Sequence, residues 1–225
     1  TEVYASRQHD GKLEILAPSS RIHNRGCTLT SALTVEINAP SEGVIQADVW
    51  HFKGGNIKYP EYEIKHDGTK LTAKETESAI SCFSGPLECR ISKEPGVWSL
   101  EFFAFGQRLT GCGDRSLGRI LDKNTDTSYM YEELDLDVGE YIYGLGERFG
   151  AFTKNGQAVE MWNGDGGTCS ELAYKNIPLY LSNKGYGVFV NDTGDTSFEV
   201  GSENCEKVQI AVKGEHLSLD RKSVV

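Results

Sequence analysis

The chain has 225 residues, of which 38% are apolar and 25% are charged, the balance of a soluble globular domain. Its net charge of −10 repels phosphate backbones and anionic lipid, so we expect neither a nucleic-acid nor a membrane partner. There is no run of 18 apolar residues and no basic leader before an apolar run, so the sequence predicts no membrane span and no signal peptide. We therefore expect a cytoplasmic protein, with the reservation that the chain begins at Thr1 rather than at Met.

Short segments in which apolar and polar residues alternate recur along the chain. A period of two predicts a half-buried antiparallel strand, and it is clearest at residues 45–49, 87–91 and 208–212. The other strands predicted, in chain order, are 28–37, 61–66, 70–75, 97–105, 128–136, 140–145, 177–182, 186–191 and 196–200. Several Xaa-Gly turn signals, such as Asp67-Gly68 and Lys184-Gly185, separate these segments.

The pattern favours an all-β fold. No segment of helical length carries an apolar stripe with a period of 3.6 residues, and no repeat is evident. We predict a large antiparallel β-sandwich of two sheets over residues 1–219. Residues 220–225 break the alternation that precedes them, and we interpret them as a truncated or added tail.

The cysteines and histidines form no metal motif. There are six cysteines and five histidines, without a Cys-x-x-Cys pair and without a histidine at zinc-ligand spacing from a cysteine. A chain of this length does not depend on disulfides in the way that a small secreted scaffold does. We expect free thiols, no metal and no cofactor.

The stretch between Phe149 and Ile177 differs from the rest. It contains five glycines and no clear period, and long segments of this kind in compact domains are usually functional or disordered. Three aromatic residues, Phe152, Trp162 and Tyr174, argue against disorder. We expect the function to reside here.

A glycine-rich motif, residues 143–150, precedes this stretch. It does not fit the dinucleotide-binding fingerprint, because its third glycine is one position late and no βαβ unit surrounds it. The glycines favour a tight strand exit where two backbones approach closely. Glu147 and Arg148 are candidates for a buried ion pair there.

The residues from Trp162 to Thr168 have the chemistry of a sugar site. An indole ring offers apolar area to sugar C–H groups, and a carboxylate accepts strong hydrogen bonds from hydroxyls. The alternative is a surface turn that Asp165 merely caps. The candidate substrate-binding residues are Trp162, Asn163, Asp165, Gly166 and Gly167.

Catalytic residues are not evident. Glycoside cleavage needs two carboxyl groups at a fixed separation, and among 33 acidic residues no pattern marks such a pair. The chain also lacks a Gly-x-Ser-x-Gly elbow and a P-loop. We assign no catalytic residue.

The stretch from YIYGLGERFG to GYGVFVN, residues 141–191, closely resembles the N-terminal domain of glycoside hydrolase family 31, most strongly that of the bacterial and fungal α-xylosidases. The likeness covers residues 128–214 well. Residues 30–127 match weakly but in the same order, including the stretch SKEPGVWSLEFF. The resemblance implies a β-sandwich of the galactose mutarotase-like kind.

The resemblance also implies how such a domain is used. In the family a (β/α)₈ barrel follows the sandwich and carries the nucleophile and the acid/base, and that barrel is absent here. A loop of the sandwich reaches over the barrel mouth with an aspartate that contacts sugar, and by motif this residue is Asp165. Relatives often carry arginine at the position of Gly164. The implied partners are an α-xyloside or α-glucoside and the missing barrel.

Three functions remain open from the sequence. The first is a non-catalytic N-terminal domain of an α-xylosidase-like or α-glucosidase-like retaining enzyme, inactive on its own. The second is a free-standing carbohydrate-binding module. The third is a sugar mutarotase, which needs a poised acid and base, and no histidine here lies in a motif that suggests one.

Overall fold

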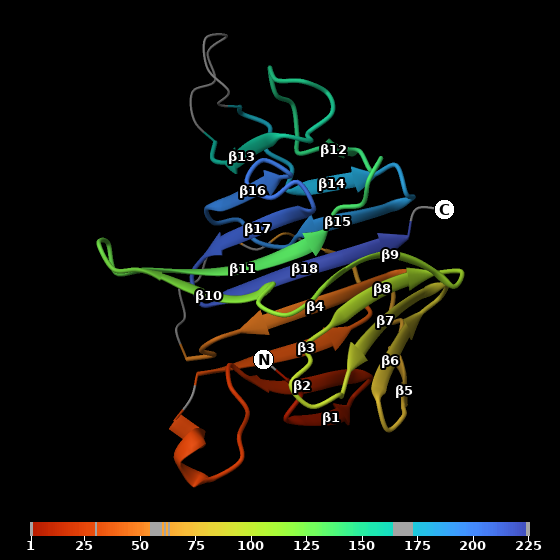
Figure 1. The fold of residues 1–225 in the computed structure, drawn as a ribbon. Coiled ribbons are helices and arrows are strands. Elements are labelled where there is room, and N and C mark those ends of the chain that lie inside the picture. The colour runs from red at the N-terminus through yellow and green to blue at the C-terminus, as the bar shows by residue number, and fades with distance from the viewer. Residues whose placement is uncertain are drawn as a thin grey trace.

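The computed structural model describes residues 2–29, 31–54, 60, 62, 64–163 and 173–223. These residues form three β-sheets and one short 3₁₀-helix, η1 (Arg25–Leu29), and the strands within each sheet pair antiparallel (Figure 1). No helix in this described part is long and apolar enough for a membrane crossing. The predicted all-β antiparallel fold is confirmed.

The large sheet contains eight strands, and the second and third sheets contain five each, within the described ranges. In spatial order the large sheet consists of β1 (Ala5–His9), β2 (Lys12–Pro18), β3 (Ala32–Asn38), β4 (Val44–Trp50), β18 (His216–Ser223), β15 (Tyr186–Val190), β14 (Leu179–Ser182) and β12 (Ile142–Gly144). The second sheet consists of β10 (Leu117–Asp122), β11 (Thr127–Asp135), β17 (Lys207–Lys213), β16 (Thr196–Val200) and β13 (Gln157–Met161). The third sheet consists of β5 (Thr72–Glu75), β6 (Ala79–Ser84), β7 (Leu87–Ser92), β8 (Leu100–Ala104) and β9 (Gln107–Cys112).

Several elements differ from the prediction. A third sheet accompanies the two expected ones, and the strands that were not predicted are β1, β2, β6, β9, β10, β13 and β18. The segment 61–66 was predicted as a strand, but its described residues, 62 and 64–66, lie outside strands. The five described cysteines are free thiols, as expected.

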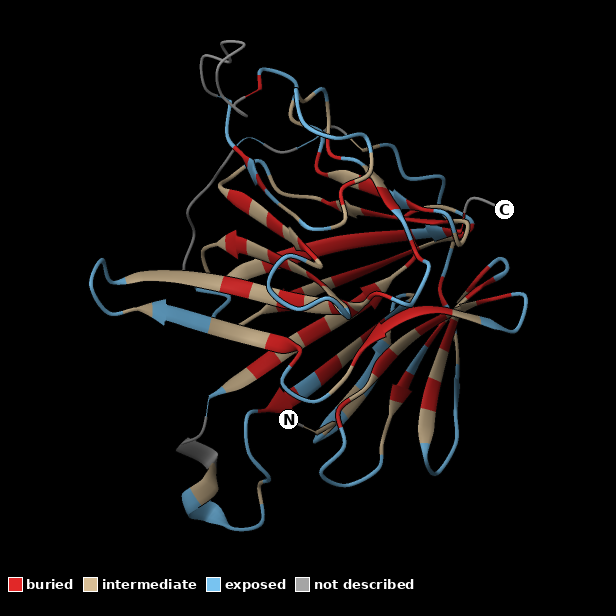
Figure 2. Ribbon diagram, turned by 45° about the horizontal axis from the view of Figure 1, so that its top comes forward, coloured by how far each residue is buried: buried red, intermediate tan, exposed pale blue. Residues whose placement is uncertain are grey.

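Burial follows the alternation read from the sequence. Val208, Ile210 and Val212 on β17 are completely buried, and the residues between them are half-buried. Figure 2 shows buried and intermediate residues alternating along many of the strands. Ile45 and Val49 on β4 are buried in the same way. The core therefore lies between the inward faces of the sheets, where the periodic apolar positions meet.

The expected tail does not begin after Leu219. The strand β18 continues to Ser223, and Arg221 pairs with Ile45 of β4 in the ladder. The alternation breaks because position 221, which faces the core, holds an arginine. Its guanidinium binds Glu132 of β11 at 2.5 Å and lies 4.3 Å from the ring centroid of Phe102 on β8. One side chain thus touches all three sheets.

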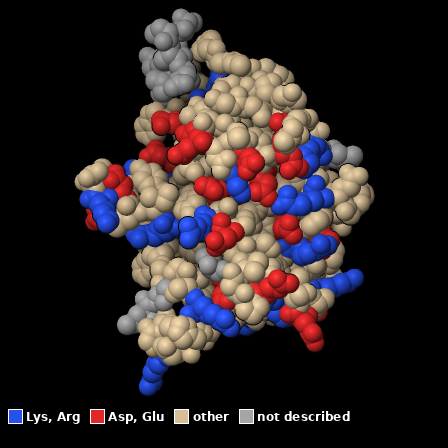
Figure 3. Space-filling model, in the orientation of Figure 1, with Lys and Arg blue, Asp and Glu red and all other residues tan. Residues whose placement is uncertain are grey.

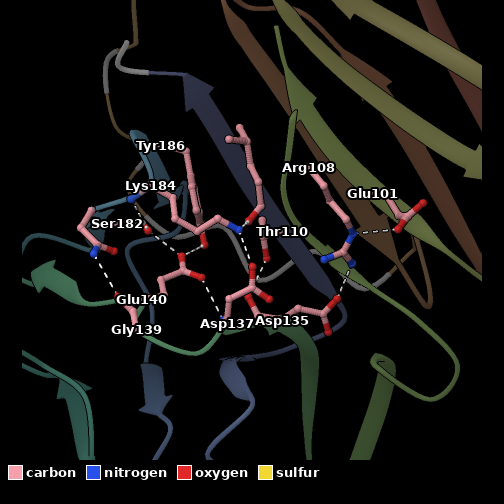
Figure 4. Close-up of polar contacts among 12 residues, drawn as sticks. Glu101, Arg108, Thr110, Asp135, Asp137, Gly139, Glu140, Ser182, Lys184 and Tyr186 are labelled. Atoms are coloured by element: carbon pink, nitrogen blue, oxygen red, sulfur yellow. Dashed lines mark hydrogen bonds and ion pairs between the residues drawn. The ribbon is translucent and has the colours of Figure 1, made fainter. Parts of the chain in front are cut away.

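A second polar junction joins the turn after β11 to the large sheet (Figure 4). The Glu140 carboxylate accepts hydrogen bonds from the hydroxyls of Ser182 (2.5 Å) and Tyr186 (2.6 Å) and from the backbone N–H of Asp137 (3.0 Å). Lys184 binds the Asp137 carboxylate at 2.6 Å and the backbone of β9 at 2.6 Å. These bonds fix β12, and with it the start of the glycine-rich motif.

Asp220 makes the folded protein sensitive to pH. It follows Leu219 and precedes Arg221 on β18, so its side chain lies on the other face of the large sheet from theirs. It pairs with Gln46 of β4, and only 9% of its surface is exposed. Burial, and then the neighbouring charge of Asp48, raises the pKa of Asp220 to about 6. As pH rises from about 4 to about 6, the unfolded chain therefore ionises first, and stability is lost over that window. Below this pH window the carboxyl group of Asp220 is protonated in both the folded and the unfolded state, so it does not change the free energy of unfolding with pH.

We therefore expect Asp220→Asn to raise the free energy of unfolding by about 1–3 kcal/mol at pH 7 and to have little effect near pH 4. Urea unfolding of both proteins at the two pH values measures this difference. An equal change at both pH values would show that the substitution acts through packing and not through the charge of Asp220.

Candidate functional site

The candidate sugar-binding residues lie where β13 ends. Trp162 and Asn163 follow this strand directly, both are exposed, and Trp162 has 61% of its surface in solvent. Asp165, Gly166 and Gly167 belong to residues 164–172, which lie outside the described residues. The structure therefore places only the first two residues of the predicted motif, Trp162 and Asn163.

The segment 149–177, predicted to have no regular structure, contains a strand. Its residues Gln157–Met161 form β13, which pairs with β16 so that Glu160 lies opposite Ser197. The strand is the edge of the second sheet. The backbone of Trp162 follows directly after this paired strand, so its position is restrained, and this limits the positions that the indole ring can take.

The two ends of residues 164–172 are held side by side. Asn163 and Ala173 form an isolated parallel bridge. The Asn176 amide donates to the side-chain oxygen of Asn163 (2.7 Å) and to the carbonyl of Ala173 (3.1 Å). We call this arrangement of Asn163, Ala173 and Asn176 the neck. Because the neck holds Asn163 next to Ala173, the residues that flank 164–172 on either side are neighbours in space.

Arg148 supports the neck from the side of β13. Its guanidinium donates to the carbonyls of Leu145 (3.1 Å) and Glu160 (2.6 Å) and to the side-chain oxygen of Asn176. The predicted buried pair between Glu147 and Arg148 is wrong. Glu147 is exposed and binds Lys175 at 2.8 Å, and its backbone N–H donates to the carbonyl of the same residue. Arg148 instead satisfies backbone and amide oxygens.

The glycine-rich motif brings its backbone close to the neck. Gly146 has φ +86, and a Cβ atom on it would lie 1.9 Å from the carbonyl oxygen of Lys175. The adjacent N–H of Glu147 donates to that same carbonyl at 3.0 Å. The close approach expected from the glycines is confirmed, and only glycine fits at this point.

A groove of about 400 Å³ opens beside Trp162 on the outer face of the second sheet. It is lined by Tyr129, Glu160, Met161, Trp162, Asp195, Thr196, Ser197 and Ala211. No local sequence signal marks this groove, because its residues come from four strands and their flanks. Only the pairing of β13, β16, β17 and β11 brings them together.

One cluster could in principle hold a metal ion. His9, Glu14 and Glu36 place ligand atoms within 4.8 Å of one another, the one such group among the described residues. Arg7 binds Glu14 at 3.3 Å, and Lys12 binds Glu36 at 2.7 Å. These cations already neutralise both carboxylates, so we interpret the cluster as a set of surface ion pairs.

The comparisons with known proteins place the chain in a family. The model of the glycosyl hydrolase 31 N-terminal galactose mutarotase-like domain matches residues 34–199. The chain belongs to this family. The matched residues include the neck and Trp162 at the groove wall.

Two curated relatives in this family are α-xylosidases. The chain is 39% identical over 217 residues to α-xylosidase XylQ of Lactiplantibacillus pentosus, covering 96% of this chain and 28% of that protein. It is 43% identical over 215 residues to an α-xylosidase of Emericella nidulans, covering 86% of this chain and 27% of that protein. The chain therefore spans little more than a quarter of their length.

Solved structures of glycoside hydrolase family 31 enzymes share the fold. A Flavobacterium johnsoniae dextranase in complex with isomaltotriose superposes with a TM-score of 0.77 at 21% identity, over 99% of this chain and 26% of that chain. An α-xylosidase from a soil metagenome, in complex with xylose, gives 0.73 at 13% identity, over 97% and 32%. These similarities establish the sandwich architecture.

Proposed function

We propose that this chain is the non-catalytic N-terminal domain of an α-xylosidase-like or α-glucosidase-like retaining glycoside hydrolase that acts in the cytoplasm. In this proposal a catalytic (β/α)₈ barrel packs against the domain. The segment that starts at Trp162 then reaches the barrel's active site, and Asp165 contacts the sugar. The observation that carries the proposal is the neck, which holds both ends of that segment beside a fixed sheet edge.

The neck suits a segment that must present groups to a ligand. A loop whose two ends are joined by hydrogen bonds has less conformational freedom to lose on binding than one with separated ends. Arg148 and Asn176 supply these bonds from within the domain. The curated relatives at 39% and 43% identity are α-xylosidases, which supports an α-xyloside as the substrate.

Exposed apolar side chains on the chain segments before and after Trp162 support the barrel as a partner. Their exposed fractions range from 48% to 80%, and they are Tyr141, Phe149, Phe152, Tyr174 and Ile177. The top of the molecule beyond β12 shows few charged side chains in Figure 3, whereas charges of both signs cover the strands below. A contact between domains buries roughly 600–1,500 Å² of such surface.

The proposal predicts that the 225-residue chain alone hydrolyses no glycoside. Without a pair of carboxyl groups supplied by a barrel, neither protonation of the leaving oxygen nor nucleophilic attack is arranged. We expect no release of nitrophenol from 4-nitrophenyl α-xyloside or α-glucoside. The same chain joined to a catalytic barrel of the family should release it.

A matched control is the barrel without this domain. If the segment beyond Trp162 contributes to the site, the barrel alone should have a lower kcat/KM than the joined protein. Turnover by the isolated chain that survives repurification and scales with its concentration would overturn the assignment as non-catalytic. Equal kcat/KM for the barrel with and without the domain would overturn its contribution to the site.

A further inference from the structure

The groove beside Trp162 has a floor of small side chains between taller walls. Glu160 lies opposite Ser197, and Ser197 opposite Ala211, so these residues form one row across β13, β16 and β17 on the outer face. Ser197 and Ala211 make the floor. Trp162 stands at one side and Tyr129, on β11, contributes to the lining at the other.

The lining combines the groups that recognise a neutral sugar. Two aromatic residues, Trp162 and Tyr129, offer apolar faces, and Glu160, Asp195 and Ser197 offer oxygen acceptors. Asp195 also binds Lys213 at 3.2 Å, which holds it at the groove margin. Its volume of about 400 Å³ falls within the range of roughly 300–1,000 Å³ typical of small-molecule sites.

Arg148 contacts the two residues that precede Trp162 in the groove wall. Arg148 donates to the carbonyl of Glu160 at 2.6 Å and lies 3.6 Å from the Met161 sulfur, so both residues before Trp162 contact it. On the other side of Trp162, Asn163 accepts from Asn176 at 2.7 Å. The tryptophan is therefore anchored through the residues on both sides of it, and such preorganisation lowers the entropic cost of binding a ligand.

We propose that this groove is a second carbohydrate subsite, which binds a neutral pyranose unit of an α-linked oligosaccharide in addition to the sugar contacted by Asp165. The carboxylates of Glu160 and Asp195 select against anionic sugars and accept hydrogen bonds from hydroxyls. The inference rests on the proposed function for the class of ligand, because the family relatives are enzymes of α-linked sugars. Its geometry rests on the described residues alone.

The test is a titration of the isolated 225-residue chain followed by the indole N–H signals of its three tryptophans in ¹H–¹⁵N NMR spectra. The ligands are methyl α-D-xyloside and maltose, each added up to its solubility limit. We expect a saturable shift of the Trp162 signal, which Trp162→Phe identifies by its loss. Trp98, which is 2% exposed, should not shift and serves as the internal reference. No saturable shift of the Trp162 signal would overturn the proposal.

A substitution that fills the floor separates this groove from any other sugar contact. Ala211→Tyr adds a large side chain on β17 without removing a lining group, and we expect it to weaken binding at least tenfold, about 1.4 kcal/mol. The matched control is Gln209→Tyr, two residues earlier on the same strand and face but outside the groove lining. It should bind as the unmodified chain does.

Each outcome decides between the two proposals. Binding that survives Ala211→Tyr, or that Gln209→Tyr abolishes equally, would overturn the groove assignment. If the groove binds no sugar but joining the domain to a barrel still raises kcat/KM, only the subsite proposal is overturned. Conversely, sugar binding in the groove with no effect of the domain on turnover would overturn the proposed function and leave the subsite in place.

Discussion

Replacing Glu132 by alanine should lower the free energy of unfolding by about 3–5 kcal/mol. Glu132 and Arg221 are each 2% exposed and pair at 2.5 Å in the centre of the core. Burial alone would lower the pKa of Arg221, but attraction to Glu132 and other neighbouring groups outweighs it, so the pKa is raised and the guanidinium stays charged. Without Glu132 the guanidinium would remain buried with no opposite charge, and it would also lose its anchor above Phe102. Urea unfolding at neutral pH measures the loss.

A double substitution tests whether the cost comes from the unpaired charge. Glu132→Leu combined with Arg221→Met removes both charges and retains volume, so it should recover most of the stability. The contrasting pair is Glu147 and Lys175, whose side chains are 73% and 65% exposed. Substituting either of these by alanine should leave the unfolding midpoint nearly unchanged. A double variant as unstable as Glu132→Ala would show that packing geometry, and not the buried charge, dominates.

The second large effect is kinetic. In a protein that joins this chain to a catalytic barrel, Asp165→Ala should lower kcat/KM about ten- to two-hundredfold. A hydrogen bond from a sugar hydroxyl to a carboxylate contributes roughly 1.5–3 kcal/mol, and 1.36 kcal/mol corresponds to a factor of ten. Activity should not vanish, because Asp165 is proposed neither as nucleophile nor as acid. Asp165→Asn should lose less, since its amide oxygen still accepts a hydrogen bond.

Melting temperature distinguishes the sugar contact from a turn cap. If Asp165 only closes a glycine-rich turn, the alanine variant should melt at a lower temperature and retain its kinetics. If it contacts sugar, the variant should melt as the unmodified protein does and lose kcat/KM. Unchanged kcat/KM in a well-folded Asp165→Ala protein would remove Asp165 from the substrate-contacting residues.

The three strands that the alternation marked most clearly, β4, β7 and β17, each have an uninterrupted apolar face. Val208, Ile210 and Val212 could be assigned because every second residue of β17 is buried. The strand β13 escaped prediction although Val159 and Met161 also point inward, because glycines on both sides obscured its short alternation. The third sheet could not be inferred, since local periodicity does not reveal which strands share a ladder.

The sequence indicated a candidate site segment, but it did not indicate the side chains that hold the ends of that segment. An indole, an amide and glycines in sequence indicated a sugar-binding segment at Trp162. The contact of Arg148 with Asn176 joins residues 28 positions apart and has no local signature. The misplaced tail has the same origin. Arg221 looked foreign to a strand, and its partner Glu132, 89 positions away, becomes visible only when the sheets are assembled.

The position of β18 bears on how the protein is made. This last described strand lies between β4 and β15 in the middle of the large sheet, and Gln46 and Ser218, hydrogen-bonded across the β4 pairing, are 172 residues apart. On a ribosome, β1–β4 would emerge early, and β4 would keep an unpaired edge until residues 51–215 had followed. Such edges template aggregation, and late non-local pairing slows folding. Nascent chains that stop before His216 should therefore depend on chaperones more strongly than the finished domain.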